Sequence, residues 1–184
     1  RLFSADGSGK ATEIGKGNFD IVFSPDGKLV VTTQGRLVYV RQMPDGKLLH
    51  TLSCNEIVHG IAFSPDGRTL ATGDRSPQIS LWDPHTGILR KRWTGGTKII
   101  EGLSFSSDGR LLASSEQRGD GGPGRVWDLL LGGEPAVLKG NTVGVHFLPN
   151  EHTLIAPTQK AIQVWDIVVP ELETTIARFD APSQ

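Results

Sequence analysis

Histidine and aspartate are the residues of this 184-residue sequence that could support acid–base or metal chemistry. The five histidines are scattered without the spacing of a metal site, and they are His50, His59, His85, His146 and His152. His85 lies in the sequence Asp-Pro-His-Thr-Gly, which favours a turn residue over a ligand. The sequence contains no Gly-x-Ser-x-Gly elbow, phosphate loop, His-Glu-x-x-His helix or Cys-x-x-Cys pair. We therefore predict no catalytic residue, no metal and no cofactor.

The aspartates form two series that recur along the chain. One series is Asp26, Asp66 and Asp108, and the other is Asp83, Asp128 and Asp166. Carboxylates must lie close together to act as an acid–base pair. Because the members of each series are about one repeat apart, we expect them to be far apart in space. We interpret them as turn and cap residues.

An internal repeat explains this spacing. Its aromatic landmarks Phe23, Phe63, Phe105 and Phe147 are 40, 42 and 42 residues apart. They lie in the segments IVFSPDGKLVV (21–31), IAFSPDGRTLA (61–71), LSFSSDGRLLA (103–113) and VHFLPNEHTLI (145–155). Trp82-Asp83, Trp127-Asp128 and Trp165-Asp166 follow the last three landmarks, and we expect Tyr39 to take the Trp place in the first repeat.

Turn signals divide each repeat into short strands. The Asp-Gly sequences after each of the first three Phe residues favour tight turns, since Asp caps the turn and Gly accepts positive φ. Apolar runs flank these turns, and further turns follow at 43–46, 83–87 and 131–134. The pattern predicts about four strands per repeat, which we call a, b, c and d. The apolar a and c strands should be central, and the polar d strands should be the outer ones.

The segments LATGDRSPQISLWD (70–83) and FSPDG (63–67) resemble the Trp-Asp (WD) repeat β-propeller family. The resemblance covers nearly the whole chain. It implies an all-β fold of four four-stranded antiparallel blades, and a non-catalytic scaffold or adaptor that binds other proteins or peptide segments. Two other functions stay open: a sensory or substrate-binding propeller attached to a regulatory enzyme, and a propeller-type hydrolase or lyase with its site at the central channel.

The same resemblance implies a hydrogen-bonded tetrad of His, Asp, Ser or Thr, and Trp in a blade. In the second repeat Thr72 and Trp82 keep their places, while Cys54 falls near the His position and Ser76 at the Asp position. His59 is nearby but out of register. We therefore expect an incomplete tetrad and a greater dependence on packing.

We expect one WD-repeat segment over residues 1–184, and we expect it to be part of a larger propeller. Residues 1–15 would end a preceding blade, with a candidate outer strand at 10–14, and the last blade would have its own outer strand at 174–179. The four blades would span 16–54, 55–96, 97–139 and 140–181. Four blades are at the low end of the range for a closed propeller. Additional blades in the same chain, or self-association, would cover the two end faces.

The resemblance places the b–c and d–a loops on one face. The b–c loops would be 34–36, 74–78, 116–124 and 158–160, and the d–a loops 16–18, 55–56, 95–98 and 139–141. From the b–c and d–a loops we take the candidate partner-binding residues Arg36, Asp74, Arg75, Gln78, Lys98, Glu116, Arg118, Asp120 and Lys160. Arg favours interfaces because its planar fork binds carboxylates. We expect this face to suit an acidic or polar peptide.

Two short motifs within the repeats have alternative interpretations. The Gly-rich insertion EQRGDGGPG at 116–124 cannot extend a strand, so it should protrude as a loop. Its Arg118-Gly119-Asp120 resembles an integrin-binding motif. The alternative interpretation is an ordinary surface loop without a binding role. The basic run Arg90-Lys91-Arg92 could contact nucleic acid, or could protect an edge strand from pairing with another sheet.

The composition narrows the classes of partner and compartment. The 19 basic and 20 acidic side chains give a net charge of −1, which does not favour a nucleic-acid partner. No apolar run is long enough to cross a bilayer, so we expect no membrane partner. Cys54 is the single cysteine and cannot form an internal disulfide, and no signal peptide is visible. These features favour the cytoplasm.

Overall fold

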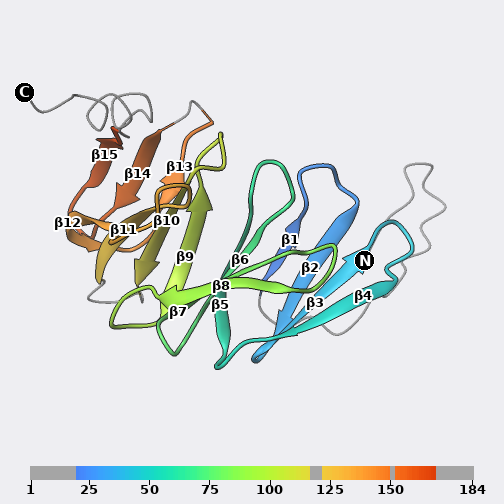
Figure 1. The fold of residues 1–184 in the computed structure, drawn as a ribbon. Helices are drawn as coiled ribbons and strands as arrows, with labels where there is room; N and C mark the ends of the chain where they lie inside the picture. Colours follow the sequence, from blue (N-terminus) through green and yellow to red (C-terminus); the bar gives the residue numbers. More distant parts are fainter. Residues whose placement is uncertain (1–19, 117–121, 150–151, 169–184) are drawn as a thin grey trace, which may run out of the picture.

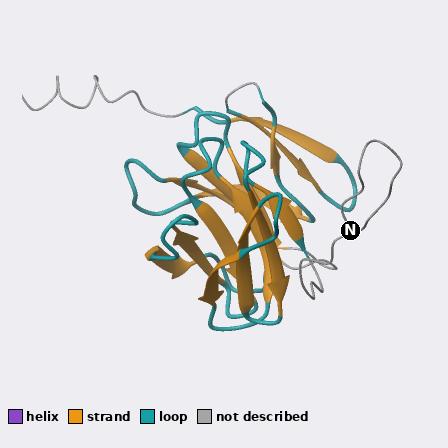
Figure 2. Ribbon diagram, turned by 90° about the vertical axis from the view of Figure 1, so that its right-hand side faces the viewer, coloured by secondary structure: helices purple, strands orange, loops and turns teal. Residues whose placement is uncertain are grey.

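All regular structure in the described part of the chain is β-strand (Figure 2). The computed structural model describes residues 20–116, 122–149 and 152–168. The expected outer strands at 10–14 and 174–179, and the expected end of a preceding blade at 1–15, lie outside these ranges. No helix long and apolar enough to traverse a bilayer occurs in them.

Four antiparallel sheets follow one another along the chain, and each is a meander in which consecutive strands are neighbours. The first sheet contains β1 (Ile21–Phe23), β2 (Leu29–Gln34), β3 (Leu37–Gln42) and β4 (Leu48–Ser53). The second contains β5 (Val58–Phe63), β6 (Leu70–Asp74), β7 (Gln78–Trp82) and β8 (Leu89–Thr94). The third contains β9 (Ile100–Phe105), β10 (Leu111–Glu116), β11 (Gly122–Asp128) and β12 (Ala136–Thr142). The fourth contains β13 (His146–Phe147), β14 (Thr153–Pro157) and β15 (Ile162–Asp166).

The sheets stand side by side in an open row, from the first sheet on the right of Figure 1 to the fourth sheet on its left. Their first strands adjoin each other, because β1 contacts β5, β5 contacts β9 and β9 contacts β13. Repeated four-stranded meanders whose first strands gather along one axis are blades of a β-propeller. In the described residues the propeller is an arc and not a closed ring.

The turn between the first two strands of a blade is built in the same way three times. In the first blade the Ser24 hydroxyl donates to Asp26 Oδ1 at 2.7 Å and accepts from the Leu29 N–H at 2.8 Å. Gly27 follows at φ 70°, a conformation that glycine adopts without strain. Ser64 with Asp66, and Ser106 with Asp108, repeat the arrangement. The predicted turn role of these aspartates is confirmed.

The turn between the last two strands uses the second series of aspartates. Asp83 Oδ1 accepts hydrogen bonds from the backbone N–H groups of the second and third following residues, at 2.9 and 3.2 Å. Asp128 does the same at 3.0 and 2.9 Å. Each carboxylate also pairs with an arginine, Asp83 with Arg90 and Asp128 with Arg110. Asp166, by contrast, is exposed at the end of β15.

The hydrophobic core lies between the blades. Three clusters of buried residues fill the three junctions between blades. The first junction contains Leu52 and Trp82, the second contains Leu81 and Leu112, and the third contains Leu138 and Leu154. Each sheet therefore buries both faces only if it has a neighbour on both sides.

Burial differs from the expectation for the first strand of the first blade, whereas β5 and β9 have no exposed residue. The second strands are the most buried, and β6 and β10 are buried at every residue. The first strands were expected to be central, but β1 exposes Ile21 and Phe23 by 60% and 48%. β1 belongs to the first described blade, so no described blade precedes it along the arc. The polar outer position of the fourth strand is confirmed by β8, whose first three residues are exposed.

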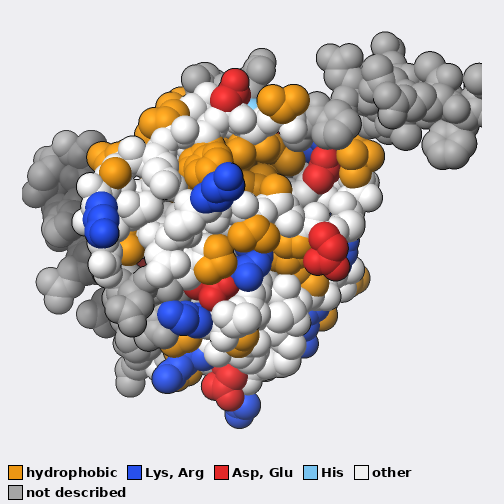
Figure 3. Space-filling model, turned by 90° about the vertical axis from the view of Figure 1, so that its left-hand side faces the viewer, with side chains coloured by type: hydrophobic (Ala, Val, Ile, Leu, Met, Phe, Trp, Pro, Cys, Tyr) orange, Lys and Arg blue, Asp and Glu red, His pale blue; other side chains and the backbone are white. Residues whose placement is uncertain are grey.

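One end of the arc exposes a sheet face that is covered elsewhere. By strand register, Ile162 and Val164 of β15 occupy the positions in the fourth blade that Ile79 and Leu81 of β7 occupy in the second. Ile79 and Leu81 are 0% and 8% exposed against the third blade, whereas Ile162 and Val164 are 72% and 67% exposed. Figure 3 looks toward this end of the molecule, where hydrophobic side chains gather at the surface. The exposed face of the fourth blade is therefore a surface of the kind that packs against another blade, and no described residues cover it.

Candidate functional site: a loop face with exposed cations

The loops that join second to third strands and those that join successive blades lie at the same end of the meanders. We define the loop face as residues 35–36, 54–57, 75–77, 95–99 and 158–161. Backbone hydrogen bonds tie these loops together: Cys54 N–H donates to Arg36 O at 2.9 Å, and Gly95 N–H donates to Pro77 O at 2.7 Å. A face tied by backbone hydrogen bonds can hold side chains in fixed positions.

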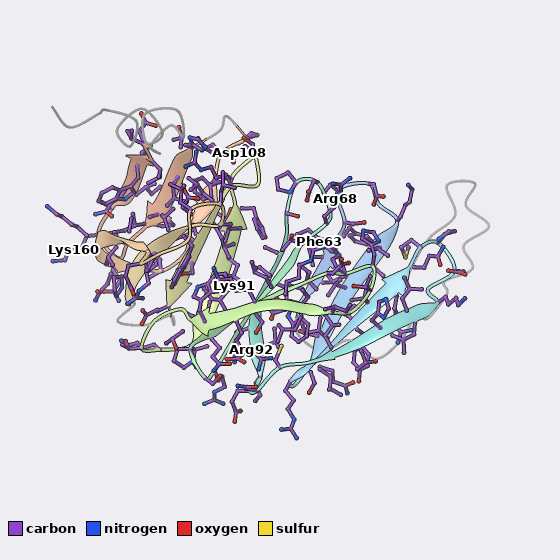
Figure 4. The ribbon with its side chains drawn as sticks, in the orientation of Figure 1. Phe63, Arg68, Lys91, Arg92, Asp108 and Lys160 are labelled. Atoms are coloured by element: carbon purple, nitrogen blue, oxygen red, sulfur yellow. The ribbon has the colours of Figure 1, made fainter. Side chains whose placement is uncertain are left out.

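Four of the predicted binding residues are exposed cations on this face: Arg36, Arg75, Lys98 and Lys160. In Figure 4, Lys160 lies at the tip of the β14–β15 loop, away from Arg68 and Asp108 on the opposite, upper end of the blades. Gln78 is half-buried and its Oε1 accepts from Asn55 Nδ2 at 2.8 Å. Arg118 and Asp120 lie outside the described residues, and their binding roles stay predictions.

Asp74 is not available to a partner. Its side chain is buried, and Oδ1 accepts from the Ser76 backbone and hydroxyl at 2.9 and 2.6 Å. Oδ2 accepts from the Glu56 N–H at 3.4 Å. Asp74 therefore holds the β6–β7 turn and the preceding inter-blade loop together, which is a structural role and not the predicted binding role.

Glu116 is also a structural residue. It is 2% exposed, forms an ion pair with Arg125, and accepts hydrogen bonds from Thr97 Oγ1 and Lys98 N–H at 3.2 and 3.1 Å. The carboxylate thus anchors the β8–β9 loop to the third blade. Sequence reasoning missed this pair because Arg125 lies nine residues away, beyond the glycine-rich segment.

Two predicted loops are shorter than expected. Residues 122–124 of the glycine-rich insertion belong to β11, and residues 139–141 belong to β12. Pro123 pairs with Asn141 of β12 beside a bulge. It lies beyond the last residue of β11 that pairs with β10, so its missing N–H interrupts no hydrogen bond between these two strands. Residues 117–121, which contain most of the insertion, lie outside the described ranges.

Cys54, Thr72 and Trp82 form a hydrogen-bonded chain under the loop face. Trp82 Nε1 donates to Thr72 Oγ1 at 3.0 Å, and Cys54 Sγ lies 3.5 Å from the same hydroxyl. Burial raises the pKa of the Cys54 thiol, which keeps it protonated and unreactive. The predicted Cys54, Thr72 and Trp82 positions are confirmed, but Ser76 bonds to Asp74 and stands apart from the chain.

The other blades keep less of this chain. In the third blade Trp127 Nε1 donates to Ser114 Oγ at 3.2 Å. In the first blade the strand register places Arg41 opposite Val30, as Trp82 is opposite Leu70. Arg41 and not Tyr39 therefore takes the Trp place, and the expectation for Tyr39 was wrong because it matched the residue by its aromatic type and not by its place in the strand register.

The basic run at 90–92 is not a continuous charged stripe. Arg90 pairs with Asp83 at 2.6 Å, while Arg92 donates to Ser80 Oγ and Asn55 Oδ1, both at 3.0 Å. Lys91 and Arg92 leave opposite sides of β8 (Figure 4) because side chains alternate along a strand. This dispersal favours the edge-strand interpretation of the run over a nucleic-acid contact.

A cleft of about 330 Å³ lies on the axial side of the arc. Its lining includes Asp20, His59, Glu101 and His146 from the first three inter-blade junctions. His59 Nε2 is buried and has no hydrogen-bond partner within the described residues. Sequence reasoning considered a site at the central channel but did not name Asp20 or Glu101 for it. In the described part of the chain, no group of three or more His, Cys, Asp or Glu residues could hold a metal ion.

Repeated four-stranded blades, inter-blade cores and a face of paired loops define a β-propeller segment. The family model described as "WD domain, G-beta repeat" matches residues 46–83, which run from the turn before β4 through Trp82-Asp83. Residues 46–83 therefore resemble a WD repeat, and the propeller fold of the described residues agrees with that resemblance.

Known proteins resemble the chain over part of their length. The intraflagellar transport protein 122 homologue of Danio rerio is 31% identical over 74 residues, 39% of this chain and 6% of the relative. An uncharacterized WD repeat-containing protein of Synechocystis is 36% identical over 74 residues, 38% of this chain and 21% of the relative. The chain thus spans a small part of these relatives.

Solved structures match more of the fold. The RRP9 WD40 repeats and U3-55K have TM-scores of 0.71 and 0.72 at 21% identity. Each match covers 84% of this chain and about half of the solved chain, 50% and 51%. These likenesses show the fold.

Proposed function

We propose that this chain is a non-catalytic protein-interaction scaffold that binds an acidic peptide segment of another protein on its loop face. The observation that carries the proposal is the exposure of Arg36, Arg75 and Lys160 on that face, while the acidic Asp74 and Glu116 are buried in structural contacts. The face therefore presents these cations and the carboxylate of Glu56 to solvent, and keeps two carboxylates inside.

The loops can hold these cations in fixed positions. Arg36 lies in the two-residue β2–β3 turn, and its carbonyl accepts the Cys54 N–H. Arg75 follows Asp74, whose carboxylate fixes the turn, and the Arg75 N–H donates to Ile57 O at 3.0 Å. Preorganised loops lower the entropy lost when a partner binds, because less backbone must be ordered.

A selection from a display library of random peptides tests this proposal. We expect enriched peptides to be acidic, and their affinity to fall about tenfold or more for the variant R36E/R75E/K160E, because like charges then oppose each other. Lys28→Glu, at an exposed turn on the opposite end of the first blade, is the matched charge control and should change little. Enriched peptides that bind the triple variant as tightly as the native chain would contradict the proposal.

The buried Cys54 and the absence of a second cysteine fit a reducing compartment. A cytoplasmic location remains part of the proposal.

A further inference from the structure

A groove at the outer rim, between the second and third blades, departs from the repeat. It has a volume of about 360 Å³, and its lining includes Lys91 and Trp93 of β8, Trp127 of β11, and Leu129 and Glu134 of the turn that follows. Trp93 lies opposite Ile79 in the second blade, and Leu52 lies opposite Val38 in the first. Trp93 and Leu52 therefore occupy the same position in their blades. Leu52 is 3% exposed, whereas Trp93 is only half-buried.

A second departure lies in the turn that borders this groove, and Leu129 of that turn lines the groove. The turn after β11 reads Leu129-Leu130-Leu131, where the corresponding turns of the first two blades read Met-Pro-Asp and Pro-His-Thr. Leu130 and Leu131 are 63% and 51% exposed. Turn residues on a protein surface are usually polar. This apolar turn lies beside the half-buried rings of Trp93 and Trp127, and exposed apolar surface of this kind marks a binding site for an apolar group of a partner.

The aromatic walls of the groove are close together. The rings of Trp93 and Trp127 have centroids 5.3 Å apart and are tilted by 53°. Trp127 Nε1 has its acceptor in Ser114, but Trp93 Nε1 is buried and has no partner within the described residues.

The groove lining carries the cation of Lys91 and the carboxylates of Asp128 and Glu134, of which Asp128 is paired with Arg110. Lys91 Nζ lies 5.1 Å from the centroid of the Trp93 ring and is exposed, whereas the neighbouring arginines are held by Asp83, Ser80 and Asn55. Lys91 is therefore the cation of this run that can meet a carboxylate at the groove. The adjoining β8 pairs with β7 on one side and is the last strand of its sheet, which suits a partner in extended conformation.

We propose that this rim groove binds an extended peptide in which a bulky apolar side chain stands next to an acidic residue. The apolar side chain contacts Trp93, Trp127 and Leu129, and the carboxylate pairs with Lys91. This site is separate from the loop face, so one scaffold would hold two segments. Tryptophan is the residue most often responsible for binding energy at such contacts.

The experiment selects random displayed peptides on the variant R36E/R75E/K160E, which removes ligands of the loop face. We expect enrichment of peptides with Phe, Leu or Trp beside Asp or Glu. Their binding should change the intrinsic tryptophan fluorescence of the chain. Trp93→Leu, which installs the residue found at this position in the first and third blades, should weaken binding about tenfold or more.

Lys91→Glu gives a second measure that does not alter the aromatic wall, and should weaken binding several-fold. Lys47→Glu, at the exposed outer turn of the first blade, is the control and should bind as the parent does. Failure to enrich any peptide, or unchanged affinity in both Trp93→Leu and Lys91→Glu, would overturn the inference. Because the parent already lacks the loop-face cations, this outcome is independent of the loop-face proposal.

Discussion

Thr72 accepts the indole N–H of Trp82 at 3.0 Å in the second blade, whereas in the fourth blade the strand registers put Ala156 at the position equivalent to Thr72. Trp165 there takes the position equivalent to Trp82. Trp165 Nε1 is buried and has no partner within the described residues. The same repeat position therefore carries a satisfied indole in one blade and an unsatisfied one in another.

Restoring the missing hydroxyl should stabilise the fourth blade. We expect Ala156→Ser to raise the free energy of unfolding by about 0.5–1.5 kcal/mol, the net value of one hydrogen bond. Ser114→Ala, which removes the acceptor of Trp127, should lower it by about 1–3 kcal/mol. Urea denaturation of the two variants and the native chain measures both changes. A loss of stability in Ala156→Ser would show that the site has no room for the hydroxyl.

The buried carboxylate of Glu116 should be one of the most sensitive positions for stability. Glu116→Ala leaves Arg125 without its partner and removes the acceptor of the Lys98 N–H, so we expect a loss of about 3 kcal/mol or more. The double variant Glu116→Ala/Arg125→Met should recover part of that loss, since no unpaired charge then remains. Thermal or urea unfolding of the double-mutant cycle measures the coupling. Additive effects would contradict the buried pair.

The turn aspartates should make stability fall in acid. Hydrogen bonds from Ser24 and the Lys28 N–H lower the pKa of Asp26 to about 2. Partial burial raises the pKa of Asp108, but hydrogen bonds from Ser106, Arg110 N–H and His152 outweigh it and lower that pKa to about 2. An aspartate of lowered folded-state pKa contributes stability above its usual pKa of 3.8, and that contribution disappears as the pH falls toward 2.

We therefore expect the unfolding midpoint to fall between pH 4 and about 2. Asp108→Asn, which cannot titrate, should show a smaller fall over the same interval. Equal slopes for the native chain and this variant would show that Asp108 titrates normally in the fold.

The exposed face of β15 should tolerate charge where its equivalent in β7 does not. We expect Ile162→Lys/Val164→Lys to leave the unfolding midpoint nearly unchanged and to reduce aggregation, because both side chains face solvent in the described structure. Ile79→Lys/Leu81→Lys should prevent folding, because the charges would be buried against the third blade. Circular dichroism and light scattering compare them. Unfolding by the β15 pair would show that another segment covers this face.

Sequence reasoning succeeded where the signal is local or repeated. The Phe and Trp landmarks, the Asp-Gly turns and the polar outer strand β8 all follow from patterns within one 42-residue repeat, and the structure confirms them. The alignment of Tyr39 with the tryptophans failed because an aromatic residue was matched by type, while the ladder places Arg41 there.

The candidate site was less accessible to sequence reasoning. Loop membership correctly indicated Arg36, Arg75 and Lys160 as exposed cations, but loops also contain residues that fix the loops themselves. Asp74 and Glu116 belong to that second group, because their carboxylates accept backbone hydrogen bonds from neighbouring loops. Contacts between blades, such as Trp93 with Trp127, join residues 34 positions apart and leave no local pattern.

The loop face is tested most directly by hydrogen–deuterium exchange of the chain with and without a library-selected acidic peptide. Amide exchange slows where binding orders or covers the backbone. The account predicts protection in the loops at 35–36, 54–57, 75–77 and 158–161, and none of it in the variant R36E/R75E/K160E. Protection confined to the axial strands β1, β5 and β9, or to the turns that contain Asp26, Asp66 and Asp108, would contradict it.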